Sequence, residues 1–314
     1  MIEIDLICAF FKISTMPTNI KAHIFLLTVA FIYGANYSIA KLILDDQYIM
    51  PMNLVMFRIT CGAILFGLFH KVFIKERIDK SDYKRLFLCA LTGVVVNQSF
   101  FIVGLKYTEP INAALIMTTT PIMVLLTSAF LIKEKITSRK ILGILIGISG
   151  AIALILAKNS NLAWTIDNLK GDLMVLLNAI SYSIYLVLVK SLMKKYHPLT
   201  VVKWVFAIGF FLLLPFGAVG IENIEWSSFP SSVWAALAFV LLGTTFLAYL
   251  LNAAALKTVN PSVVSIYIYF QPLFATVIAL LIGKDVLTWE KVAAGILIFI
   301  GVYLVSFRPK KAVS

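Results

Sequence analysis

The sequence contains the stretch LKYTEP at 105–110 and a second version of it, LKTVNP, at 256–261. The two stretches lie 151 residues apart, and the same spacing relates Pro121 to Pro272. Further matches at this spacing, without a gap, extend through the 40 residues that follow each stretch. A series of that kind indicates an internal duplication rather than chance. The chain is therefore predicted to consist of two similar halves.

Long apolar stretches alternate with short polar breaks along the chain. Of its 314 residues, 61% are hydrophobic and 13% are charged, whereas soluble domains are roughly 45–50% apolar and about 25% charged. A membrane-spanning helix needs about 20 mostly apolar residues. Each stretch is continuous, unlike the alternating strands of a membrane β-barrel. The sequence predicts an all-α membrane protein with ten transmembrane helices, at 22–42, 51–70, 86–105, 110–132, 141–157, 172–193, 200–221, 232–255, 260–282 and 288–307.

The duplication divides these spans into two groups of five. Because five is odd, the second half enters the membrane from the opposite side, and the halves are inverted repeats. Such repeats let one central site face each side in turn; the alternative is a duplication that serves stability alone. The sequence leaves two alternatives for the first residue of the protein, Met1 and Met16. The predicted segments are a cytoplasmic N-terminal segment 1–21, a first repeat 22–157, a linker 158–171, a second repeat 172–307 and a basic cytoplasmic tail 308–314.

The net charge of +12 is unevenly distributed among the predicted loops. The loop after the second span, at 71–85, holds six Lys and Arg residues, whereas loops on the opposite side mix lysines with acids. This bias predicts that both termini lie in the cytoplasm. We expect the protein in the plasma (inner) membrane. The basic excess therefore indicates topology and contact with the lipid bilayer, and not a nucleic-acid partner.

The cysteines and histidines predict no catalytic or metal site and no cofactor. The three cysteines lack ligand-like spacing, and the three histidines lie far apart near span ends. No acidic residue lies in the middle of a predicted span. We therefore do not expect an enzyme, and we keep a lipid-modifying membrane enzyme or a non-transporting scaffold only as the alternative from another class.

A fixed order of motifs runs through both halves. A mid-span proline is followed thirteen residues later by an acid, as Pro121 by Glu134 and Pro272 by Asp285; the other motifs are Tyr33-Gly34, Lys41, Pro51, Arg58 and Gly171-Asp172. From 22 to 307 the chain resembles the drug/metabolite transporter superfamily in its ten-span EamA-type branch. Asp285 stands where that family usually has Glu, and Tyr33 stands where Trp is usual. The resemblance implies a secondary transporter that exports amino acids or related small metabolites by alternating access.

Polar and aromatic residues recur at helical spacing within several predicted spans. A solute path through hydrocarbon needs polar side chains that face the bundle interior, because such groups are costly when they face lipid. For any single residue, the alternative is a hydrogen bond to a neighbouring helix. We expect a central cavity for a small-molecule solute lined by Tyr33, Asn36, Tyr37, Arg58, Asn97, Phe101, Asn178, Tyr182, Tyr185, Tyr249, Asn252, Tyr269 and Gln271.

Three basic residues within spans support an alternative function. Arg58 lies about seven residues into the second span, where it either snorkels to the surface or faces the cavity and attracts carboxylate or phosphate groups. Together with Lys41 and Lys190, it motivates an anion exchanger for sugar phosphates or nucleotide sugars. Lys41 and Lys190 lie near span ends, so snorkelling is also open for them.

Proline and glycine predict local features of three spans. Pro121 and Pro272 each free a backbone carbonyl, so both helices are expected to kink there, either as gating elements or as static kinks. Gly143, Gly147 and Gly150 share one face of the fifth span. Small residues at this spacing indicate close helix packing within the chain or in a homodimer.

Overall fold

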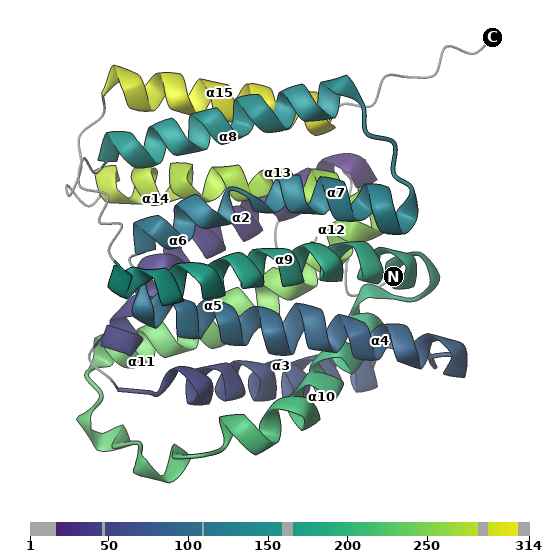
Figure 1. Ribbon diagram of the computed structural model, residues 1–314. Coiled ribbons are helices and arrows are strands. Elements are labelled where there is room, and N and C mark those ends of the chain that lie inside the picture. The colour runs from purple at the N-terminus through teal and green to yellow at the C-terminus, as the bar shows by residue number, and fades with distance from the viewer. Residues whose placement is uncertain (1–16, 46–47, 109, 159–165, 282–287, 307–314) are drawn as a thin grey trace.

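In the computed structural model, residues 17–45, 48–108, 110–158, 166–281 and 288–306 are described, and their regular structure is helical (Figure 1). The first half comprises α2 (Thr18–Asp45), α3 (Pro51–Phe73), η1 (Lys80–Asp82), α4 (Tyr83–Ala90), η2 (Leu91–Val95), α5 (Val96–Tyr107), α6 (Pro110–Met117), α7 (Thr120–Ile132) and α8 (Ser138–Lys158). The second half comprises α9 (Ile166–Lys195), α10 (Pro198–Gly217), η3 (Ile221–Asn223), η4 (Trp226–Ser228), α11 (Ser231–Ala238), η5 (Phe239–Leu247), α12 (Ala248–Thr258), α13 (Pro261–Ile266), η6 (Tyr267–Tyr269), α14 (Phe270–Leu281) and α15 (Trp289–Ser306).

Consecutive short helices join into longer spans, such as α4 with η2 and α5, and α13 with η6 and α14. Within the described ranges, nine such spans are long and apolar enough to cross a membrane. The 21-residue helix α8 occupies the remaining predicted stretch. The prediction of an all-helical membrane protein is confirmed. Most of the predicted segments 1–21 and 308–314, with both candidate start residues, lie outside the described residues, and α9 begins inside the predicted linker 158–171.

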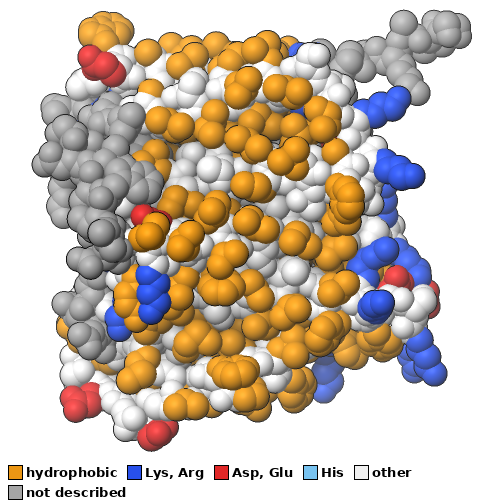
Figure 2. Space-filling model, in the orientation of Figure 1, with side chains coloured by type: hydrophobic (Ala, Val, Ile, Leu, Met, Phe, Trp, Pro, Cys, Tyr) orange, Lys and Arg blue, Asp and Glu red, His pale blue; other side chains and the backbone are white. Residues whose placement is uncertain are grey.

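The spans run antiparallel, and the two halves begin at opposite ends of the bundle. In Figure 1, α2 begins and α15 ends at the right, whereas α9 begins at the left. Lysine and arginine side chains gather along the right edge of Figure 2, where α3 ends and α4 begins, and hydrophobic side chains cover the face between the ends. We call this the basic end and the opposite one the far end.

Both halves interrupt their helices at matching positions. The third and eighth spans contain π-helical turns, η2 and η5, around Gly93 and Gly243. The fourth and ninth spans are broken shortly before Pro121 and Pro272, because proline cannot donate the hydrogen bond that continues an α-helix. The first break is a turn between α6 and α7, and the second is the 3₁₀ turn η6.

The glycine face of α8 packs against helices of the same chain. A Cβ on Gly143 would lie 2.9 Å from the carbonyl oxygen of Gly301 in α15, and one on Gly150 would lie 2.8 Å from that of Ala294. A Cβ on Gly147 would meet the Tyr269 ring at 2.5 Å. This face is therefore buried within the chain, which favours close helix packing, the first of the two predicted alternatives.

Candidate substrate cavity

A cavity lies among α2, α3, α5, α6, α9, α12 and the broken span α13–η6–α14. Its empty volume is about 720 Å³, which includes space open to solvent. The described residues that line it come from both halves, as expected of a site between inverted repeats. Eleven of the predicted residues contribute: Tyr33, Asn36, Tyr37, Arg58, Asn97, Phe101, Asn178, Tyr182, Tyr249, Asn252 and Gln271.

Two predicted residues, Tyr185 and Tyr269, are absent from this lining. Tyr185 is buried and stacks on Tyr182 at 6.2 Å between ring centroids, and its ring fills the space where a Cβ on Gly93 would be. Tyr269 is fully buried against α8 and donates a hydrogen bond of 3.4 Å to the carbonyl oxygen of Ile144. Both tyrosines pack helices together.

Eight further residues line the cavity and were not predicted from the sequence: Leu26, Val29, Ala30, Gln98, Met117, Val264, Tyr267 and Ile268. Most are apolar and carry no signal that separates cavity from core. Tyr267 was missed because η6 is a 3₁₀ turn, which rotates about 120° per residue instead of 100° and so changes which side chain faces inward. The Tyr267 hydroxyl lies 2.6 Å from Nδ1 of His23 in α2.

Hydrogen bonds join the two halves across the cavity. The Tyr37 hydroxyl in α2 donates to Oε1 of Gln271 in α14 at 3.0 Å. Tyr249 in α12 donates to the carbonyl oxygen of Gly93 at 2.8 Å, and accepts from Nε2 of Gln98 at 3.3 Å. These bonds satisfy the tyrosine hydroxyls and hold their rings in place.

The helix α9 is bound to the third span in the same way. Asn178 Nδ2 donates to the carbonyl oxygen of Asn97 at 2.7 Å, and Ser181 Oγ donates to that of Thr92 at 2.6 Å. For the Asn178 amide nitrogen, the structure therefore favours a helix–helix contact. The Asn178 amide oxygen is different, because it is buried without a hydrogen-bond partner in the described part of the chain.

Arg58 is the one charged side chain among the described residues that line the cavity. It is 4% exposed, so it does not snorkel to the surface. Its Nε donates to Thr245 Oγ1 at 3.1 Å, on the π-helical turn η5. Its Nη1 is buried, and neither a hydrogen-bond acceptor nor an acidic side chain binds it among the described residues.

Hydrogen-bond acceptors without partners lie around the same cavity. Oδ1 of Asn36, Oδ1 of Asn178 and Oε1 of Gln98 are all buried, and within the described ranges none accepts a hydrogen bond. Buried polar atoms in native proteins nearly always have a partner, so such a group calls for water or a ligand. Three amide oxygens and one guanidinium nitrogen thus offer both acceptors and a charged donor.

Lys41 and Lys190 do not line the cavity, and their ammonium groups bind backbone carbonyls instead of snorkelling. Lys41 Nζ donates to the carbonyl oxygens of Leu105 and Thr108 at 3.1 and 3.0 Å, at the end of α5. Lys190 Nζ donates to those of Leu256 and Val259, the latter at 2.6 Å, at the end of α12. The four carbonyls belong to the duplicated stretches 105–110 and 256–261. Each lysine therefore caps a helix C-terminus.

Comparison with known proteins identifies the family. The EamA-like transporter family matches residues 20–156 and again 169–307. An uncharacterized transporter of Bacillus subtilis, YyaM, is 25% identical over 291 residues, which cover 92% of this chain and 94% of that protein. An uncharacterized transporter of Archaeoglobus fulgidus is 27% identical over 294 residues, covering 92% and 99%.

More distant similarities agree with this assignment. A WAT1-related protein of Arabidopsis thaliana is 24% identical over 202 residues, which cover 58% of this chain and 51% of that protein. One crystal structure superposes with a TM-score of 0.71 and 18% identity, covering 90% of this chain and 95% of the other, which shows a shared fold. With a match in each half, and with full-length relatives named as transporters rather than enzymes, the chain belongs to the EamA-like transporter family.

Proposed function

We propose that this membrane transporter is a secondary transporter that exports amino acids or related small metabolites by alternating access. The substrate class is inferred from one observation. Arg58 is buried in the cavity, and no acidic side chain among the described residues balances its charge. A buried charge is costly unless it is paired. A carboxylate on the solute would supply the missing partner.

The remaining lining suits the other parts of an amino acid. The amide oxygens of Asn36, Gln98 and Asn178 lack donors among the described residues, and an ammonium group supplies up to three N–H donors. The rings of Phe101 and Tyr182 offer apolar surface to a side chain. An amphipathic zwitterion therefore matches the cavity better than a purely apolar solute does.

The alternative, an anion exchanger for sugar phosphates or nucleotide sugars, loses its main support. Two of its three cations, Lys41 and Lys190, bind backbone carbonyls away from the cavity. A phosphate monoester carries a charge of about −1.5 to −2 at pH 7, so Arg58 alone would leave it under-neutralised. The geometry favours a single carboxylate.

Alternating access is supported by the inverted halves that enclose one cavity.

We place the basic end in the cytoplasm, because lysine and arginine in short loops favour that side. Both termini are then cytoplasmic, in the plasma (inner) membrane. A homodimer stays a prediction, and the glycine face of α8 no longer supports it.

Transport by the purified protein in liposomes tests the proposal. A panel of radiolabelled amino acids is supplied outside vesicles preloaded with the same unlabelled compound, so that exchange concentrates the label without an imposed ion gradient. We expect at least one amino acid to accumulate, and Arg58→Gln to abolish it. Accumulation of sugar phosphates in place of amino acids would overturn the substrate class.

A further inference from the structure

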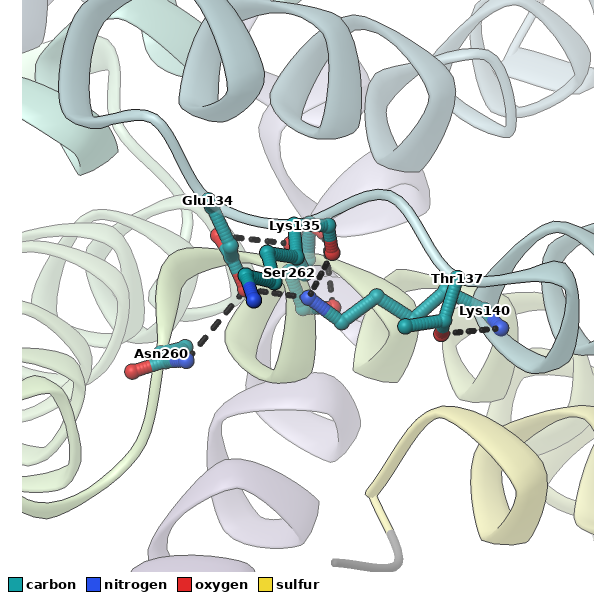
Figure 3. A network of polar contacts seen from close by, with 7 residues as sticks. Glu134, Lys135, Thr137, Lys140, Asn260 and Ser262 are labelled. Atoms are coloured by element: carbon teal, nitrogen blue, oxygen red, sulfur yellow. Dashed lines mark hydrogen bonds and ion pairs between the residues drawn. The ribbon is translucent and has the colours of Figure 1, made fainter.

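We propose that Glu134 is a latch that holds the basic end closed, and that the exchange of access requires its release. This inference rests on the alternating-access mechanism proposed above. Glu134 lies in the loop between α7 and α8 of the first half. Its Oε2 accepts a hydrogen bond from Ser262 Oγ at 3.1 Å, and its Oε1 accepts one from Asn260 Nδ2 at 3.3 Å (Figure 3). Both donors belong to the second half.

The Glu134 carboxylate is also bound by a residue of its own half, Lys140. Lys140 Nζ forms an ion pair with Glu134 Oε1 at 2.6 Å and donates to the carbonyl oxygen of Lys135 at 3.3 Å (Figure 3). The Glu134 side chain is 7% exposed and that of Lys140 is 17% exposed. Hydrogen bonds to a buried carboxylate are stronger than those of an exposed ion pair, because water competes less for them.

The helix α7 ends in a left-handed C-cap directly before this carboxylate. Lys133, the residue before Glu134, has a φ of 51° in the left-handed region, the single positive φ among the described non-glycine residues. A side chain makes this region unfavourable, so surrounding contacts must compensate. The Glu134 backbone N–H donates to the carbonyl oxygen of Ser128 at 3.1 Å, which fixes the turn.

The latch holds a short segment that forms part of the cavity wall. Asn260 and Ser262 flank the start of α13, a helix of six residues. Val264 in α13 and Tyr267 in η6 line the cavity. The helix break before Pro272 is the 3₁₀ turn η6. Because a 3₁₀ interruption in a span is a natural hinge, α13 can pivot at η6. Release of Glu134 would free α13 to move away from α7.

The repeat carries different residues at the positions equivalent to this latch. By the 151-residue spacing, the positions that match Glu134, Asn260 and Ser262 are Asp285, Glu109 and Ile111. A glutamate carboxylate is an acceptor where asparagine offers N–H donors, and isoleucine has no hydroxyl. The sequence of the first half therefore lacks the two donor side chains of the latch at these positions. This difference favours a resting state that is closed at the basic end.

Cysteine accessibility tests the latch without knowledge of the substrate. Cys8, Cys61 and Cys89 are replaced by alanine, and Asn97→Cys, in the cavity, reports access for a membrane-impermeant maleimide applied to either side of oriented vesicles. Without solute, Glu134→Gln and Ser262→Ala are expected to raise the labelling rate from the basic end about tenfold, as the loss of one such hydrogen bond implies. Labelling from the far end should not rise.

Two further variants serve as controls. Glu290→Gln makes the same change of charge at an exposed residue at the start of α15, and should label like the parent. Lys195→Gln breaks the more exposed pairs with Asp79 and Asp82 at the basic end, at 2.6 and 2.7 Å, and should also have little effect.

The outcomes separate the latch from the transport mechanism. Faster labelling from both ends in Glu134→Gln would indicate local unfolding and would contradict a latch. Equal rates for Glu134→Gln and the parent, with measurable access from the basic end, would refute the latch alone. If position 97 is never labelled from either side in any variant, alternating access itself is wrong.

Discussion

Replacement of Lys190 by methionine is expected to destabilise the protein without changing solute binding. Methionine has a similar length and fills the same space, but it cannot donate to the carbonyl oxygens of Leu256 and Val259. Lys190 is 6% exposed, so water cannot easily replace the lost donor. Leaving a buried acceptor unsatisfied costs about 1–3 kcal/mol.

Two carbonyls lose their donor, but the protein no longer bears the cost of burying an ammonium group. We therefore expect the free energy of unfolding to fall by about 3 kcal/mol. On the scale of domains of 150–250 residues, this lowers Tm by roughly 6–12 °C. Lys41→Met should destabilise the protein less than Lys190→Met does, because Lys41 is half-buried and its hydrogen bonds are longer, at 3.0 and 3.1 Å.

Thermal unfolding of the detergent-solubilised protein measures the effect. Lys194→Met is the matched control, since Lys194 is exposed on the same helix. Binding of solute to Lys190→Met, followed by its stabilising effect, should match the parent. If Lys190→Met instead keeps the parental Tm and loses binding of phosphorylated solutes, the capping role is refuted and the lysine belongs to an anion site.

Other substitutions test the cavity, the helix packing and the loop at the basic end. Arg58→Gln should weaken amino-acid binding about 100-fold, measured by equilibrium binding, because a charge-assisted hydrogen bond is lost. Gly301→Leu should destabilise the protein strongly, because its Cβ would lie 2.6 Å from the Gly143 carbonyl oxygen, whereas Gly67→Leu should not, because nothing lies within 4 Å. Burial, with the charge of Lys257 secondary, lowers the pKa of His197 to about 4 from 6.5. Between these pH values the unfolded chain binds a proton that the folded protein excludes, so Tm should fall as pH drops from 6.5 to 4, and less so in His197→Gln.

The spans could be predicted from the sequence because the bilayer fixes the length of an apolar helix. The cavity could be predicted largely from helical spacing, since polar side chains in a membrane bundle face inward. In the structure, Asn97, Arg58 and Tyr249 all line one cavity, as that rule predicts. The rule does not hold at Tyr269, which is the last residue of the 3₁₀ turn η6, because this turn shifts the helical phase.

The roles of Lys41 and Lys190 could not be predicted from spacing along one helix. Their carbonyl partners lie 64 to 69 residues away in the sequence. The duplication did hold a signal, because equivalent lysines and equivalent acceptor stretches occur in both halves. The partners of Glu134 were likewise hidden, since its contacts with Asn260 and Ser262 span 126 and 128 residues and depend on how the halves pack.

A comparison of two solutes tests the central claim, that Arg58 binds the carboxylate of the solute. The solutes are the amino acid that the liposome panel identifies and the amine that lacks only its carboxylate, each measured for binding to the parent protein and to Arg58→Gln. We expect the parent to bind the amino acid about 100-fold more tightly than the amine, and Arg58→Gln to bind the two alike. Equal affinity of the parent for both solutes would contradict the account.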